Sequence, residues 1–178
     1  MDMNFDCFIG IDPGSNGGLA VWRPNQKVQT IRMPKDLMEL KGYFEYINSI
    51  CVRPIVFLEK IQLRHDDVGE PGKAFRIQQL LASYQKLKDI IEFANIPYCL
   101  VHPLSWQSSL KLVKRNEEKK ERKNRYKSAA EYYYPEIKAT LWNADAVLIM
   151  HFGRLKRQNE PEWITKNIPS NVKNGIFD

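Results

Sequence analysis

Three acidic residues stand in apolar surroundings, where an unpaired carboxylate is costly. Asp12 ends the apolar run CFIGI and precedes a Pro-Gly turn. Glu59 ends a second apolar run, IVFL, and Asp145 lies between two alanines in NADAVLIMHFG. One acid at the end of a strand often caps a turn, but three in such contexts indicate a shared task. We therefore expect the three carboxylates to meet in the folded chain.

Clustered carboxylates repel one another at neutral pH unless a cation offsets their charge. Their hard oxygen atoms favour Mg²⁺ or Mn²⁺ over zinc. Two such ions about 4 Å apart can clamp a phosphodiester, with one activating water and the other stabilising the leaving oxygen. The glycines that follow Asp12 are interpreted as clearance for a nucleic-acid backbone. The acids therefore suggest a metal-dependent phosphodiesterase.

The basic residues of the chain are concentrated in one stretch. Residues 111–127 hold nine Lys or Arg against three Glu, a surplus equal to the net charge of +6 on the whole chain. A charged run is usually a solvated face, but a run that carries the entire excess charge is typical of a surface that binds phosphates. A nucleic-acid substrate fits both this stretch and the acids.

Hydrophobic periodicity predicts the elements that must position these residues. Short apolar runs indicate strands over residues 7–11, 18–22, 27–32, 55–58 and 98–101. Apolar residues at helical spacing indicate helices over residues 35–51, 74–95, 105–112, 122–134 and 143–155. A three-strand meander followed by alternating strands and helices predicts an α/β fold with a mixed five-stranded sheet flanked by helices.

This topology suggests how the acids meet. If the first and fourth strands are neighbours, Asp12 and Glu59 point toward the same end of the sheet, and the last helix brings Asp145 over them. The chain of 178 residues is expected to form one nuclease domain over residues 1–157. A polar tail over residues 158–178 follows, with Trp163 and Ile164 as its candidate anchors.

Other features of the sequence set the expected compartment. Cys7, Cys51 and Cys99 are widely separated and are interpreted as small buried side chains in a reducing environment. We find neither a signal-peptide pattern nor an apolar run of the roughly 20 residues that a membrane span needs. A cytoplasmic protein without a membrane partner is therefore expected.

The motifs IGIDPGSNGGLAVW, VFLEK and ADAVLIMHFG, in this order, resemble those of the RuvC-like Holliday-junction resolvases, particularly the small phage and prophage members. IPYCLVHPLSW also resembles a stretch of these proteins, and the resemblance spans residues 8–154. It implies the ribonuclease H-like fold and a homodimeric endonuclease that resolves four-way DNA by paired nicks. It further implies two Mg²⁺ per active site, replaceable by Mn²⁺, with Asp12, Glu59 and Asp145 as metal ligands.

The resemblance also implies a lysine near the scissile phosphate. By position we assign this catalytic role to Lys127, with Arg125 and Lys111 as alternatives. DNA contacts are expected from the loop after Glu59 and from the basic stretch, specifically Arg64, Lys73, Lys111, Lys114, Arg115, Lys123 and Arg125. One face of the helix over residues 74–95 is expected to pair two subunits, through Arg76, Gln79, Ser83 and Lys86.

The sequence departs from the family pattern at two positions. Many members carry an acid or a His where Trp142 stands, so either three carboxylates suffice, or Asn143 or Glu131 completes the site. Some members place an aromatic residue for base stacking where this chain has Gln62. These departures keep a second hypothesis open, namely a nucleic-acid-binding module of the same fold with weak catalysis or a different branched DNA or RNA substrate.

Overall fold

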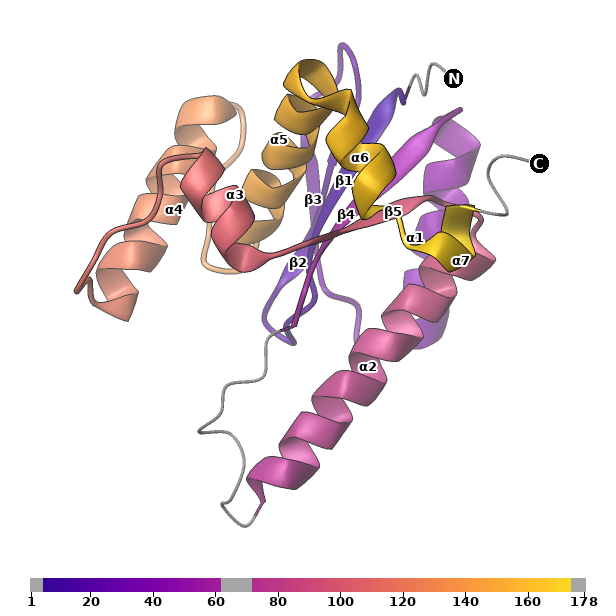
Figure 1. The fold of residues 1–178 in the computed structure, drawn as a ribbon, viewed down its shortest axis with the longest axis horizontal. Coiled ribbons are helices and arrows are strands. Elements are labelled where there is room, and N and C mark those ends of the chain that lie inside the picture. The colour runs from indigo at the N-terminus through magenta and orange to yellow at the C-terminus, as the bar shows by residue number, and fades with distance from the viewer. Residues whose placement is uncertain (1–4, 62–71, 174–178) are drawn as a thin grey trace.

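The computed structural model describes residues 5–61 and 72–173, which form a five-stranded sheet with helices on both faces (Figure 1). The strands lie in the order β3-β2-β1-β4-β5, with bounds β1 Cys7–Asp12, β2 Gly18–Trp22, β3 Gln29–Arg32, β4 Pro54–Glu59 and β5 Tyr98–Val101. β2 pairs antiparallel with β1 and β3, whereas β4 pairs parallel with β1 and β5. The mixed sheet that the sequence predicts is confirmed.

Helices cover the two faces of this sheet in two groups. On one face lie α1 (Leu37–Ile50) and α2 (Lys73–Phe93). On the other lie α3 (Pro103–Ser109), α4 (Lys119–Tyr133), α5 (Ala144–Asn159) and α6 (Pro161–Asn167), and α7 (Ser170–Lys173) follows. Successive residues of β1 point to opposite faces of the sheet. Ile9 and Ile11 therefore pack toward α1 and α2, and Phe8 packs toward α5.

Helix α5 lies unusually close to the central strand β1. Gly10 makes this approach possible, because a Cβ atom at this position would collide with the carbonyl oxygen of Ala146 and the backbone nitrogen of Met150. Gly153 plays the same role farther along α5, where an added Cβ would strike the ring of Phe57. These two contacts fix the height of α5 above the sheet, and with it the position of its first turn.

Helix α2 extends beyond the sheet that it covers, as Figure 1 shows. Its second half is anchored by Leu87 and Ile91, which are 4% and 0% exposed. Leu80 and Leu81 belong to the apolar residues at helical spacing that indicate this helix in the sequence, yet they are 37% and 42% exposed. The first half of α2 therefore presents apolar side chains without a covering element among the described residues.

The C-terminal segment is more ordered than its polar composition suggests. α5 continues past Arg157, the expected end of the nuclease domain, to Asn159. The α6 helix then packs back on the core, where Ile164 is 0% and Ile168 is 2% exposed. Trp163 lies edge-on to Phe152 of α5, with ring centroids 5.3 Å apart. The described part of the tail is thus part of the folded domain.

Candidate active site at one end of the sheet

Two of the predicted acids end neighbouring parallel strands. Ile11 of β1 pairs with Leu58 of β4, so Asp12 and Glu59 are the next residues on adjacent strands and lie at the same sheet edge. Neighbouring strands are about 4.8 Å apart, which brings the two side chains close together. The parallel pairing of β1 and β4 that the sequence argument required is present.

The third acid, Asp145, is the second residue of α5 and is 8% exposed. The close approach of α5 to β1 brings this first turn over the strand end. Asp145 is near enough to act electrostatically on both Asp12 and Glu59. The structure therefore brings the three acids together.

Burial and repulsion from neighbouring carboxylates raise the pKa of Asp12 and of Glu59. Burial is the main cause that raises the pKa of Asp12, and the charge of Asp145 adds to it. Burial likewise raises the pKa of Glu59 to about 7, with further contributions from Asp12 and Asp145. Lys123 opposes both increases. Such a site gains from a positive charge placed among the acids.

Each carboxylate is oriented by one donor. The Gly14 N–H donates to Oδ1 of Asp12 at 3.1 Å. The indole Nε1–H of Trp106 donates to Oε1 of Glu59 at 2.8 Å. The Lys123 ammonium lies 2.6 Å from Oδ2 of Asp145. Trp106 and Lys123 come from α3 and α4, so these two helices meet β1, β4 and α5 at this sheet edge.

The three acids have the oxygen ligands that a divalent cation prefers, but they are not arranged around a common point. Within residues 5–61 and 72–173, no three His, Cys, Asp or Glu side chains are arranged closely enough to hold a metal ion as they stand. In this arrangement Lys123 balances the charge of Asp145. The chemistry of the donor set nevertheless fits Mg²⁺ or Mn²⁺, since Oδ1 of Asp145 is buried with no hydrogen-bond partner in the described chain. Side-chain rotation would be needed to gather the three acids around an ion.

The glycines after Asp12 serve the site's own side chains. A Cβ on Gly17 would lie 2.7 Å from Cγ of Asp12, and one on Gly18 would lie 2.9 Å from Cε3 of Trp142. Packing within the chain is thus one reason for glycine at these two positions, and clearance for a nucleic-acid backbone stays a prediction. Trp142 packs over the start of β2, opposite Asp12, and carries the Arg32 guanidinium 5.5 Å from its ring centroid.

Neither candidate for a fourth ligand is placed to bind a metal. Oδ1 of Asn143 accepts hydrogen bonds from the backbone N–H and the hydroxyl of Thr140, at 2.7 and 3.0 Å. Although Asn143 is the N-cap residue of α5, its side chain makes no capping hydrogen bond. Glu131 accepts from the Ala139 N–H, and it lies two turns beyond Lys123 on α4, roughly 12 Å along the helix.

The basic stretch divides into exposed and engaged residues. Lys123, expected to contact DNA, is the lysine that reaches the acids, whereas Lys127 lies one turn farther along α4. Arg125 pairs with Glu117 and donates to the carbonyl oxygen of Leu112 at 2.7 Å, so its guanidinium holds the segment before α4. The remaining basic residues at the start of the stretch are exposed, namely Lys111, Lys114, Arg115, Lys119 and Lys120.

The structure does not describe the side chains of two residues that were predicted to contact DNA, nor the position where the sequence has Gln62 in place of an aromatic residue. Arg64 and Gln62 lie outside the described residues. Lys73 is the first residue of α2, and its side chain is also outside the described part.

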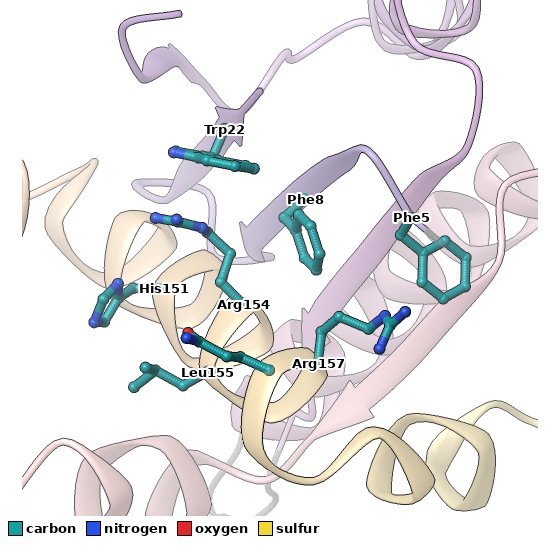
Figure 2. Close-up of a pocket in the computed structure, with 8 residues that line it drawn as sticks. Phe5, Phe8, Trp22, His151, Arg154, Leu155 and Arg157 are labelled. Carbon is teal, nitrogen blue, oxygen red and sulfur yellow. The ribbon is translucent and has the colours of Figure 1, made fainter. Parts of the chain in front are cut away.

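A cavity of about 330 Å³ lies away from the acids, between β1, β2 and the second half of α5 (Figure 2). Arg154 stacks its guanidinium 3.7 Å from the ring centroid of Trp22 and donates to the Tyr134 hydroxyl. His151 lines the same cavity, stacks on Tyr133 and lies 2.9 Å from the Tyr134 hydroxyl. Arg154 follows Asp145 by nine residues, about 13 Å along the helix, so this cavity is separate from the acidic site.

Comparison with solved structures identifies the fold. Thermus thermophilus RuvC in complex with a Holliday junction substrate superposes with a TM-score of 0.56 at 13% sequence identity, over 86% of this chain and 96% of that one. A second structure of Thermus thermophilus RuvC gives a TM-score of 0.54 at 15% identity, over 85% and 95% of the two chains. This chain has the RuvC fold.

This likeness agrees with the α/β architecture that the motifs imply. No protein-family model matches the sequence, and no curated protein matches it. The likeness to RuvC is therefore one of fold, at low sequence identity. No helix in the described part of this RuvC fold combines the length and hydrophobicity needed to cross a membrane.

Two residues of the site were not predicted to act there. Trp106 stands in the HPLSW segment, yet nothing in the sequence shows that its indole points back at Glu59. Lys123 was one of nine basic residues in its stretch, and only the packing of α4 on α5 distinguishes it. Both assignments depend on contacts between elements that are distant in sequence.

Proposed function

We propose that this chain is a divalent-metal-dependent endonuclease that cuts branched DNA, with four-way junctions as its preferred substrate. The observation that carries the proposal is the meeting of Asp12, Glu59 and Asp145, from β1, β4 and α5, at one edge of a RuvC-fold sheet. The exposed basic residues that precede α4 support a substrate rich in phosphates.

Asp12, Glu59 and Asp145 are the residues that would hold Mg²⁺ or Mn²⁺, two ions in the proposed mechanism. When bound, these ions supply an activated water and neutralise charge on the scissile phosphate. Within the chain, the Gly14 N–H and the Trp106 indole hold two of the carboxylates in fixed orientations. We assign to Lys123 the stabilisation of phosphate charge, in place of Lys127, because its ammonium is already at the acids.

The first half of α2 supports assembly as a homodimer. Phe75 is 62% exposed, and Leu80 and Leu81 follow it in the same half of the helix, 37% and 42% exposed. Two copies that pack these helices together would bury these apolar side chains, which gain free energy when removed from water. A dimer with one acidic site per subunit would allow paired nicks in the two strands of a junction.

Cleavage of labelled four-way, flap and linear DNA side by side tests this function. The proposal expects nicks in the four-way DNA with Mg²⁺ and none after chelation by EDTA, with slower cleavage of the flap and the linear duplex. Equal cleavage of all three substrates would overturn the preference for branches. No cleavage of any substrate, with Mg²⁺ or Mn²⁺, would overturn the nuclease assignment.

A nucleic-acid-binding module of the same fold is the second candidate. The Lys123–Asp145 ion pair favours it, because this contact leaves the acids without a ready metal site, and Trp142 replaces a fourth ligand. Calorimetric titration with Mg²⁺ and Mn²⁺ separates the two candidates. Binding of neither ion, together with tight binding of four-way DNA, is the result expected of a binding module.

A further inference from the structure

The Trp106 side chain is built into the floor of the acidic site. It is 0% exposed, and its indole Nε1–H lies 2.8 Å from Oε1 of Glu59. Val101, the last residue of β5, pairs with Glu59, so α3 starts directly beside the end of β4. Nδ1 of His102 accepts the Leu104 N–H at 3.2 Å and fixes the first turn of α3. Trp106 therefore reaches Glu59 from a short helix whose start is held at the same sheet edge.

Helix α4 also packs against the Trp106 indole. Tyr126 lies edge-on to Trp106 with ring centroids 5.1 Å apart, and it is 2% exposed. Tyr126 follows Lys123 by three residues, so the helix that packs on Trp106 also delivers the ammonium to Asp145. A buried indole packed in this way cannot turn away from Glu59 without opening the core.

We propose that Trp106 is a positioning residue for metal binding, which holds Glu59 through Oε1 and leaves Oε2 available to a cation. This inference rests on the proposed function. An otherwise mobile Glu side chain loses conformational entropy when it becomes a ligand, and a fixed hydrogen bond reduces that loss at the moment of binding. The indole N–H is neutral, so it satisfies one oxygen without competing with the cation for charge. Trp106 thereby acts through Glu59.

Trp106→Phe tests this role, because it keeps an aromatic ring in the core and removes the N–H donor. Calorimetric titration with Mn²⁺ is expected to show affinity about 10-fold or more below that of the wild type, the usual effect of losing a residue that orients a metal ligand. Trp163→Phe is the matched control, since it makes the same change in α6 against Phe152, and it is expected to leave Mn²⁺ affinity unchanged.

A double-mutant cycle shows whether Trp106 acts through Glu59. In a Glu59→Gln background, Trp106→Phe is expected to weaken Mn²⁺ binding by less than about 2-fold further, because contacting residues are not additive. Equal losses in both backgrounds would mean that Trp106→Phe acts by general loosening of the core, and the inference would be overturned.

The indole N–H resonance gives a readout that a purely structural role would not move. The chain has four tryptophans, and the signal of Trp106 is the one lost in Trp106→Phe. This signal is expected to shift in Glu59→Gln and to shift on Mg²⁺ titration of the wild type, with the midpoint found by calorimetry. If calorimetry shows Mg²⁺ binding but the Trp106 N–H resonance does not shift, the inference would be overturned.

The results that would overturn the proposed function differ from those that would overturn only the role of Trp106. Wild-type protein that binds neither Mg²⁺ nor Mn²⁺ would overturn the proposed function, and the positioning role with it. Wild-type protein that binds the ions and nicks four-way DNA, while Trp106→Phe does both equally well, would overturn only the role of Trp106.

Discussion

Asp145 is the acid whose charge is balanced within the chain, since Lys123 lies 2.6 Å from its Oδ2. Lys123→Met is expected to lower the free energy of unfolding by roughly 2 kcal/mol without divalent ions, because a largely buried charge loses its partner. Mg²⁺ is expected to stabilise this variant more than the wild type, since the ion replaces the lost positive charge. Chemical denaturation with and without Mg²⁺ measures both effects.

Lys127→Met is the matched control for that experiment. Lys127 lies one turn from Lys123 on α4 and forms no hydrogen bond or ion pair within the described part of the chain. Its replacement is expected to change the free energy of unfolding by less than about 0.5 kcal/mol. Equal destabilisation by the two substitutions would contradict the assignment of the ion pair to Lys123.

His151 gives the folded chain a dependence on pH that is separate from the acids. Burial is the main cause that lowers the pKa of His151 from 6.5 to about 4, and the positive charge of Arg154 lowers it further. The unfolded chain therefore binds a proton more readily between these values, and stability present above pH 6.5 is lost as the pH falls toward 4. His151→Gln is expected to remove this loss, roughly 3 kcal/mol across the window.

Urea denaturation of the wild type and His151→Gln at a series of pH values measures this difference. The two curves of stability against pH are expected to converge at low pH and diverge as the pH rises. Parallel curves would show that His151 keeps an ordinary pKa in the folded protein. The comparison between variants is needed because Asp12 and Glu59, with raised pKa values, act in the opposite direction.

The acids themselves were predictable from the sequence, whereas their partners were not. Asp12, Glu59 and Asp145 each stand in an apolar context that marks a carboxylate at the edge of the core. The donors that orient them depend on how α3 and α4 pack, and sequence spacing carries no information about that packing. Lys123 and Lys127 differ by one helical turn, so a choice between them needed the structure.

At the scale of elements, the contact between β1 and α5 determines where Asp145 lies. Gly10→Ala places a Cβ against the α5 backbone and is expected to cost at least about 2 kcal/mol of unfolding free energy. It is also expected to slow DNA cleavage, because displacement of α5 carries Asp145 away from Asp12. Thermal denaturation and a cleavage assay on the purified variant measure the two effects.

Gly42→Ala is the control for the glycine substitution. Gly42 lies on the exposed side of α1, and an added Cβ there meets no atom within 4 Å. The substitution is expected to stabilise the chain by about 0.5–1 kcal/mol, since alanine favours a helix interior over glycine. A Gly10→Ala variant as stable and active as the wild type would show that β1 and α5 tolerate separation.

The strands and most helices were predictable because each alternates or repeats its apolar residues in a regular way. Two sequence predictions of helices differ from the structure, and each difference has a physical cause. The first half of α2 has the apolar spacing of a core helix but extends past the sheet, and periodicity cannot show where a sheet ends. The α6 helix was missed because two buried residues, Ile164 and Ile168, anchor an otherwise polar segment.

At the scale of the whole molecule, the uncovered half of α2 predicts assembly. Leu80→Glu is expected to convert a dimer into a monomer, because it places a charge in the apolar contact between two copies. Sedimentation velocity measures the change against the 20.9 kDa mass of one chain. Phe93→Glu introduces the same charge at the other end of α2, where Phe93 is 85% exposed, and should leave the dimer intact. A wild-type chain that sediments as a monomer at micromolar concentration would contradict this prediction.

The net charge of +6 and the exposed basic residues before α4 fit a molecule that binds the phosphates of DNA. In the proposed function the acids supply the cutting chemistry. In that proposal the positive charge would attract the substrate, a dimer would set the spacing of two sites, and the carboxylates would hold the ions. Removal of the exposed positive charge, of the dimer contact or of a carboxylate is expected to change a different measured quantity in each case.

The nicking rate of Asp12→Asn on labelled four-way DNA in Mg²⁺ tests the central claim most directly. Asparagine keeps the shape of the side chain and an oxygen for the Gly14 N–H, but it removes the charge that a cation needs. The rate is expected to fall on the order of 1000-fold, since several kcal/mol of transition-state stabilisation are lost, while binding of the DNA remains. Nicking at the wild-type rate would contradict a metal-dependent site built on these three acids.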